Sequence, residues 1–60
     1  MTKIQILEEL KEAFPEMNLE QAFGVVDRVL STAEELTEEG HSFDETELIV
    51  EIGHFMLFEN

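Results

Sequence analysis

The side chains in this sequence that could do chemistry are almost all carboxylates. Fifteen Asp and Glu residues stand against three basic residues, Lys3, Lys11 and Arg28, which gives a formal net charge of −12 in 60 residues. Carboxylates serve as acid–base catalysts, as ligands of hard cations, or as a negative surface for a basic partner. Their spacing indicates which of these uses the chain supports.

Acid–base catalysis requires two carboxylates whose pKa values are separated by a pocket that desolvates one of them. Glu8 and Glu12 have the one-turn spacing of such a pair. A chain of 60 residues without Tyr, Trp or Cys has little from which to build the pocket. We therefore expect no enzymatic activity.

Metal binding is also not indicated. Asp44, Glu45 and Glu47 are close in sequence, but they lack the Asp-x-Asp-x-Asp-Gly spacing and the closing bidentate Glu of a calcium loop. His41 and His54 have no His or Cys partner at zinc-binding spacing. The sequence predicts neither a metal site nor a cofactor.

Rows of acidic positions favour the third use, a surface that binds a basic partner. In residues 19–39, Asp27, Glu34 and Glu38 share one helical stripe, and a second acidic pair lies beside it. Like charges four residues apart destabilise a helix by a few tenths of a kcal/mol. The predicted partner-binding residues are Asp27, Glu34, Glu35, Glu38, Glu39, Asp44, Glu45 and Glu47. Two other interpretations stay open: an ordinary solvated helix face, and the general acidity of proteins from a salt-adapted organism.

The elements that must position these carboxylates begin with a short helix over residues 3–14. Thr2 and Gln5 have the cap-x-x-Gln spacing of a helix start. Apolar residues then recur at steps of three and four. Pro15 ends the helix, because the residue before a proline avoids helical dihedral angles.

A longer helix is expected over residues 19–39. Asn18 and Gln21 repeat the cap spacing, and apolar residues follow at helical steps for about five turns. Gly40 stands where a helix end favours a left-handed residue.

Residues 43–58 fit two structures equally well. Ser42 with Glu45 would cap a third helix, and the apolar residues that follow match a helical stripe. In the other structure, Gly53-His54 forms the two-residue turn of a β-hairpin between segments rich in branched and aromatic residues. Glycine inside a helix costs about 1 kcal/mol relative to Ala.

A resemblance to a known family favours the hairpin. The chain resembles the N-terminal half of HU and IHF, the bacterial histone-like proteins, over nearly its whole length. The matching residues are Met1-Thr2-Lys3, Ala22-x-x-x-Val26-Asp27-x-Val29-Leu30, Glu35, Gly40 and Gly53-His54-Phe55. The resemblance implies one α+β domain over residues 1–60: helix, helix and β-hairpin in an HU-like intertwined homodimer without DNA-binding arms. The alternative is an all-α, three-helix domain.

The charge departs from that family. HU-like proteins hold DNA with basic arms and a basic saddle, whereas the corresponding positions here are mostly acidic or neutral, so no DNA-binding residue is carried over. Because DNA binding requires Lys and Arg, we expect an acidic DNA mimic that blocks the basic surface of a nucleoid-associated protein, above all HU. Small acidic proteins of this kind are typical of lytic phages, which places it in the host bacterial cytoplasm, without direct contact to nucleic acid or membrane.

Two rival functions remain. If the fold is HU-like, the chain could instead pair with an HU monomer and give an armless heterodimer. Otherwise it is an acidic regulatory module for another basic DNA- or RNA-binding protein.

The apolar content predicts self-association. A 60-residue chain buries only about 60% of its unfolded surface, yet 43% of these residues are hydrophobic and no Cys provides a disulfide. We therefore expect a homodimer. The five Phe residues are assigned to the core and the dimer interface, with Phe43, Met56 and Phe58 as an alternative partner-binding patch.

Overall fold

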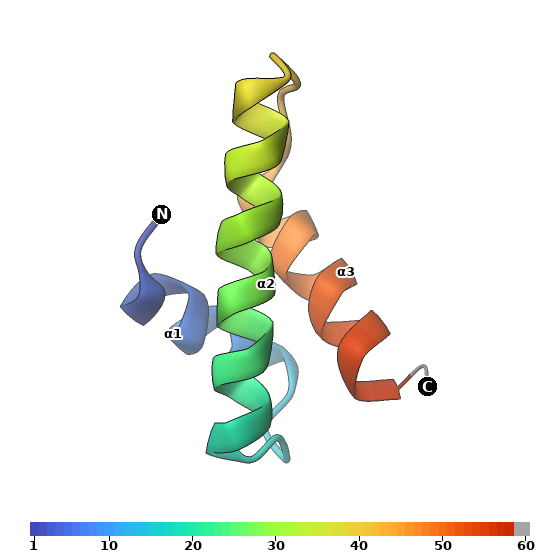
Figure 1. The fold of residues 1–60 in the computed structure, drawn as a ribbon. Coiled ribbons are helices and arrows are strands. Elements are labelled where there is room, and N and C mark those ends of the chain that lie inside the picture. The colour runs from blue at the N-terminus through green and yellow to red at the C-terminus, as the bar shows by residue number, and fades with distance from the viewer. Residues whose placement is uncertain (59–60) are drawn as a thin grey trace.

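The computed structural model describes residues 1–58 and consists of three helices (Figure 1). They are α1 (Lys3–Ala13), α2 (Leu19–Glu38) and α3 (Glu45–Phe58). The long helix α2 spans the molecule, and α1 and α3 pack against it and against each other. The two helices predicted from the spacing of apolar residues are thus confirmed, each to within one residue at its ends.

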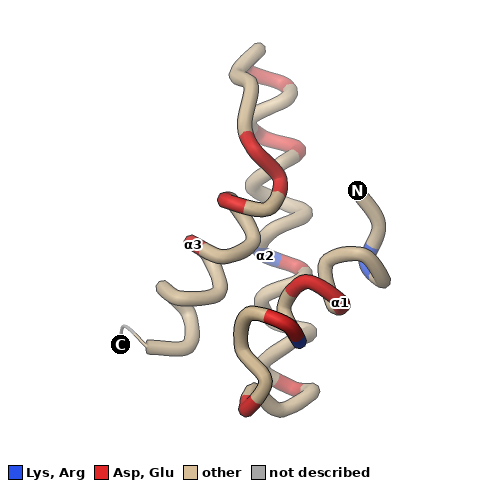
Figure 2. Tube along the Cα trace, turned by 180° about the vertical axis from the view of Figure 1, so that it is seen from behind, with Lys and Arg blue, Asp and Glu red and all other residues tan. Residues whose placement is uncertain are grey.

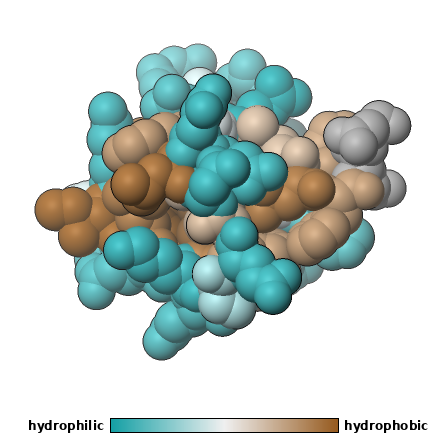
Figure 3. All heavy atoms as spheres, turned by 90° about the horizontal axis from the view of Figure 1, so that it is seen from below, coloured by the Kyte–Doolittle hydropathy of each residue, from teal (hydrophilic) through white to brown (hydrophobic). Residues whose placement is uncertain are grey.

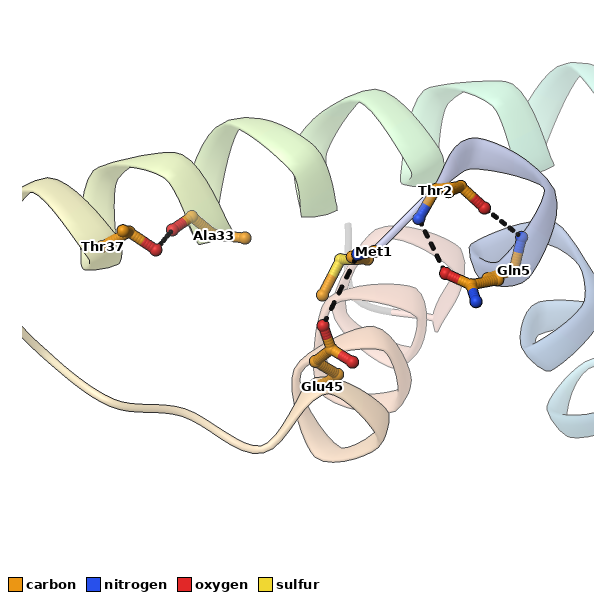
Figure 4. A network of polar contacts seen from close by, with 6 residues as sticks. All are labelled: Met1, Thr2, Gln5, Ala33, Thr37 and Glu45. Carbon is orange, nitrogen blue, oxygen red and sulfur yellow. Dashed lines mark hydrogen bonds and ion pairs between the residues drawn. The ribbon is translucent and has the colours of Figure 1, made fainter.

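Both predicted capping boxes at the starts of α1 and α2 are present. The backbone N–H of Gln5 donates to Thr2 Oγ1 (3.2 Å), and the N–H of Thr2 donates to Gln5 Oε1 (2.9 Å; Figure 4). Asn18 and Gln21 make the same reciprocal pair at 2.8 and 3.1 Å. Each box satisfies two backbone groups at once, so these helix starts are fixed locally.

The end of α2 is also fixed by local geometry. Gly40 has φ of +78°, the left-handed conformation that costs a residue with a Cβ about 1–2 kcal/mol. The N–H of His41 donates to the carbonyl of Leu36 (2.9 Å), and that of Gly40 donates to the carbonyl of Thr37 (3.1 Å). This pair of bonds is a Schellman motif, which turns the chain back towards α3.

The predicted β-hairpin is wrong: the third segment is helix α3, and no strand occurs between residues 1 and 58. The α+β, HU-like fold is therefore overturned, and the architecture is that of the all-helical alternative. The reason lies at Gly53, which is buried against the end of α1. A Cβ at this position would lie 2.6 Å from Phe14 Cε2 and 3.2 Å from Leu10 Cδ2. The glycine allows two helices to approach closely, and the packing gained offsets its helix cost of about 1 kcal/mol.

The cap of α3 differs from the predicted pair of Ser42 and Glu45. The N–H of Glu47 donates to Asp44 Oδ1 (3.0 Å), and the N–H of Leu48 donates to the Asp44 carbonyl (2.9 Å). Asp44 therefore caps the helix, and it has the same three-residue spacing to Glu47 that marks the other two starts.

The hydrophobic core is small and lacks fully buried aromatic residues. Its buried side chains come from all three helices: Ile6, Leu10, Ala22, Val25, Val26, Val29 and Ile49. Phe14 and Phe43 are partly buried, whereas Phe23, Phe55 and Phe58 are exposed. Phe23, Phe55 and Phe58 therefore lie outside the core of the single chain, where the buried residues of α2 are Ala22 and three valines. Of the two places predicted for the Phe residues, the core and a dimer interface, the second is the one left for these three.

Two glycine substitutions should change stability in opposite directions. Gly40→Ala meets no atom within 4 Å but retains φ of +78°, so it should lower the free energy of unfolding by about 1 kcal/mol. Gly24 lies inside α2, and a Cβ there would be 3.8 Å from Met56 Cε, which is an ordinary contact. Because Ala favours the helix over Gly, Gly24→Ala should raise the free energy of unfolding by about 0.5–1 kcal/mol. Urea unfolding followed by far-UV circular dichroism measures both, and changes of the same sign would contradict the geometry of α2.

The cap of α3 is tested by a second pair of variants. Asp44→Ala should lower the free energy of unfolding by about 1 kcal/mol. Asp44→Asn should cost much less, because Asn is an equally good helix cap. Ser42→Ala should stay within about 0.5 kcal/mol of the parent. If Ser42→Ala lowered the free energy of unfolding more than Asp44→Ala in the same urea titration, Ser42 and not Asp44 would be the cap of α3.

Candidate partner-binding surface

The eight acidic residues predicted to bind a partner are all exposed. Seen from behind, acidic positions follow α2 along its length and continue at the start of α3, while the second half of α3 carries none (Figure 2). We call the acidic residues of the last turns of α2 (Glu34, Glu35, Glu38 and Glu39) and those at the start of α3 (Asp44, Glu45 and Glu47) the acidic region.

The charge density along α2 approaches that of a nucleic-acid strand. From Asp27 to Glu39 the helix axis advances about 18 Å, at 1.5 Å per residue. Five of the predicted carboxylates and Arg28 lie within this length, so the net charge is −4, about one negative charge per 4.5 Å. A single strand of B-DNA has one per about 3.4 Å of axis, and the duplex has one per about 1.7 Å. The helix can therefore offer a basic groove roughly the charge of one strand.

The carboxylates at the end of α2 occupy a position that helix electrostatics disfavour. The C-terminal end of a helix carries a partial negative charge, which attracts Lys and Arg and repels Asp and Glu. The last turn of α2 contains no basic residue. Glu34 with Glu38 and Glu35 with Glu39 are also like-charge pairs one turn apart, which adds repulsion. These four charges lower the stability of the helix that carries them.

The acidic residues of α3 have the opposite relation to their helix. Glu45 and Glu47 lie in its first turn, where the partial positive charge favours carboxylates. Asp44 is the cap, and a Glu45 oxygen lies 3.9 Å from the N-terminal ammonium of Met1 (Figure 4). Asp44 and Glu45 thus contribute to local structure, which gives them a reason to be acidic that the end of α2 does not have.

Few cations neutralise the surface from within. The ion pairs found across residues 1–58 are Met1 with Glu45 and His41 with Glu39, both at 3.9 Å, and the second requires a protonated imidazole. Lys3, Lys11 and Arg28 take part in neither pair. Exposed ion pairs contribute at most about 1 kcal/mol, so the carboxylates of α2 are left largely to solvent or to a partner.

A shallow open groove lies between the second half of α2 and the start of α3. It is lined by Leu36, Ser42, Phe43, Asp44, Glu47, Leu48 and Glu51. Glu51 was not among the predicted residues; it lies one turn beyond Glu47 on α3, about 6 Å along the axis. The i, i+4 spacing was present in the sequence, but a strand would have separated the two residues by about 13 Å. The groove combines carboxylates with half-buried apolar side chains, as a surface that binds a basic, partly apolar segment would.

Other chemistry finds little support in the geometry. Glu8 and Glu12 are both exposed, so neither has the desolvation that a catalytic pair needs. In the part of the chain that the structure describes, no three His, Cys, Asp or Glu residues are grouped so that they could hold a metal ion. None of the three helices is both long enough and apolar enough to cross a membrane.

Comparisons with family models, with curated proteins and with solved structures give no match for this chain.

Reversing charges at the two helix ends should have opposite effects on stability. Glu38→Lys removes the repulsion from Glu34 and places a cation at the negative end of α2, so it should raise the free energy of unfolding by about 0.5–1 kcal/mol at low ionic strength. Glu47→Lys places a cation at the positive end of α3 and should lower it by a similar amount, about 0.5–1 kcal/mol. Thermal unfolding measured at low salt and again at about 1 M NaCl provides the check, because screening should shrink both effects. Equal effects at the two salt concentrations would rule out an electrostatic cause.

Proposed function

We propose that this protein is an acidic DNA mimic that binds the basic DNA-binding surface of a nucleoid-associated protein and excludes DNA from it. The observation that carries the proposal is the group of four exposed carboxylates in the last turns of α2. Among residues 1–58, the one ion pair that any of them makes is that of Glu39 with His41, which requires a protonated imidazole. Because these charges destabilise their own helix, stability does not account for them. Binding to a cationic surface does, since it replaces the repulsion with attraction.

HU is the target to test first. The sequence resemblance to HU and IHF motivates this choice, although the hairpin that the resemblance implied is replaced by α3. The charge per unit length of α2 supports a site that otherwise holds a nucleic-acid backbone. The alternative hypothesis was a heterodimer of this chain with an HU monomer. It required an HU-like hairpin and interface, and the three-helix fold does not provide them.

Two other interpretations make different demands on the molecule. A solvated acidic face, or adaptation to high salt, requires only that the charges be exposed. In both cases any effect on a basic target should depend on the net charge of the protein and not on which residues carry it. A mimic requires particular carboxylates at the acidic region. Variants with equal net charge but different positions therefore separate these interpretations.

The test is a competition gel shift in which a preformed HU–DNA complex is titrated with this protein. Release of DNA is expected. Because salt also weakens the HU–DNA complex, the salt dependence is measured on direct binding of the protein to HU without DNA, which should weaken at least tenfold between about 50 and 200 mM salt. The double variant Glu34→Gln with Glu38→Gln should lose about tenfold in potency, the equivalent of about 1.4 kcal/mol.

The matched control is Glu12→Gln with Glu16→Gln, two exposed carboxylates at the end of α1 and in the turn that follows it. This variant removes the same number of charges, again four positions apart, from the end of the molecule away from the acidic region. It should lose less than about threefold, because a distant charge acts only through long-range attraction. Equal losses of potency for the two variants would indicate that net charge alone matters. If the folded parent protein released no DNA, HU would be excluded as the target.

A further inference from the structure

The end of the molecule opposite the acidic region exposes large apolar side chains. They lie at the start of α2 and in the second half of α3, and we call them the apolar end: Leu19, Phe23, Phe55, Met56 and Phe58. Their exposed fractions run from 40% for Met56 to 63% for Leu19 and Phe58. Three Phe residues are exposed here, whereas residues 1–58 contain seven buried hydrophobic side chains, and apolar exposure on this scale marks an interaction surface.

Contacts between the elements show that the apolar end is one region. Gly24, next to Phe23 on α2, lies beside Met56, whose Cε is 3.8 Å from the position of a Cβ on that glycine. The ring of Phe58 lies 5.9 Å from that of Phe14, in the turn that leads into α2. From below, apolar residues form a band across this end, with polar residues on both sides of it (Figure 3).

The accessible surface of the chain is larger than its mass predicts, and the apolar end contributes part of it. The accessible surface is 4472 Å², whereas a monomeric protein of 6.9 kDa should expose about 4,000 Å². The five exposed side chains account for about 500 Å² of apolar surface, taking roughly 200 Å² for each Phe and slightly less for Leu and Met. A stable interface of standard size buries about 800 Å² on each partner. The apolar end is thus large enough to form the centre of such an interface.

The charge distribution identifies the partner as a second copy. Residues 52–58 contain no Asp or Glu, although the chain as a whole carries −12. Glu20 follows Leu19 in the first turn of α2 and Glu16 lies near Phe58, so this end is less acidic than the acidic region but not neutral. A basic partner would gain less attraction here than at the acidic region, and two highly acidic copies would meet less repulsion. We propose that the apolar end is the interface of a homodimer, formed by the same residues of both chains.

This dimer would hold two acidic regions apart. The helix α2 has 20 residues and is about 30 Å long, with the apolar end at its start and Glu34 to Glu39 at its other end. Pairing through the starts of α2 therefore leaves both acidic regions free. The interface does not depend on the proposed function, because self-association and binding of a basic target respond to salt in opposite directions.

Sedimentation equilibrium of the full chain tests the proposal at about 50 and about 300 mM NaCl. The expected mass is twice the 6.9 kDa of one chain, with tighter association at the higher salt because screening reduces the repulsion between copies. Phe23→Ser with Phe55→Ser should weaken association by at least tenfold. Circular dichroism should show unchanged helix content, since both side chains are exposed.

The matched control is Ile4→Ser, which alters a side chain that is 69% exposed on the first turn of α1. The start of α1 lies by the start of α3, where Met1 meets Glu45, and α3 extends about 20 Å from there to Phe58. This variant should associate within about twofold of the parent. A monomer at both salt concentrations, or equal weakening by Ile4→Ser, would overturn the proposal.

A second measurement does not depend on how the serine variants fold. The chain has no Cys, so Leu19→Cys introduces a single thiol at the apolar end and Ile4→Cys introduces one far from it. Mild oxidation should convert Leu19→Cys to a covalent dimer much faster than Ile4→Cys. Equal rates of cross-linking would place the interface elsewhere.

Discussion

The close approach of α3 to the end of α1 at Gly53 is the constraint on which the rest of the structure depends. A side chain at this position would overlap the ring of Phe14 and crowd Leu10, so α3 can cross α1 only where it has no Cβ. That crossing places Ile49 in the core, the start of α3 beside the second half of α2, and its end next to the start of α2. The groove with its carboxylates and the apolar end are both consequences of this one contact.

The chain folds although its charge opposes folding, because local backbone interactions are strong and the charges remain in water. Two capping boxes, the Asp44 cap and the Schellman motif at Gly40 define the helix ends. Among residues 1–58, no polar or charged side chain is buried, so the core bears no desolvation cost. What the core lacks is size, since its largest members are Ile and Leu. A monomer with this core has little stability to lose, and the repulsion at the end of α2 is therefore significant for it.

The two ends of α2 differ in the physical forces that they offer to partners. The acidic region offers long-range attraction, which salt screens. The apolar end offers burial of surface, which salt does not weaken. If both proposals hold, one short chain uses the length of a single helix to separate self-association from target binding. A dimer would then present acidic regions on both copies, and a target with two basic sites would bind it more tightly than it binds a monomer.

The sequence by itself determined the helices of residues 3–13 and 19–38, because caps, Pro15, Gly40 and the spacing of apolar residues act over a few residues. It also determined that the carboxylates of α2 are exposed, since they occupy the face away from the valines. It did not decide the structure of residues 45–58, where the signals for a helix and for a hairpin were balanced and the resemblance to HU favoured the wrong one. The tertiary structure decided that segment through the packing of Gly53 against Phe14 and Leu10, a contact between residues about 40 positions apart that no local pattern encodes. The same packing decided which Phe residues are exposed and brought Glu51 beside the predicted acidic residues.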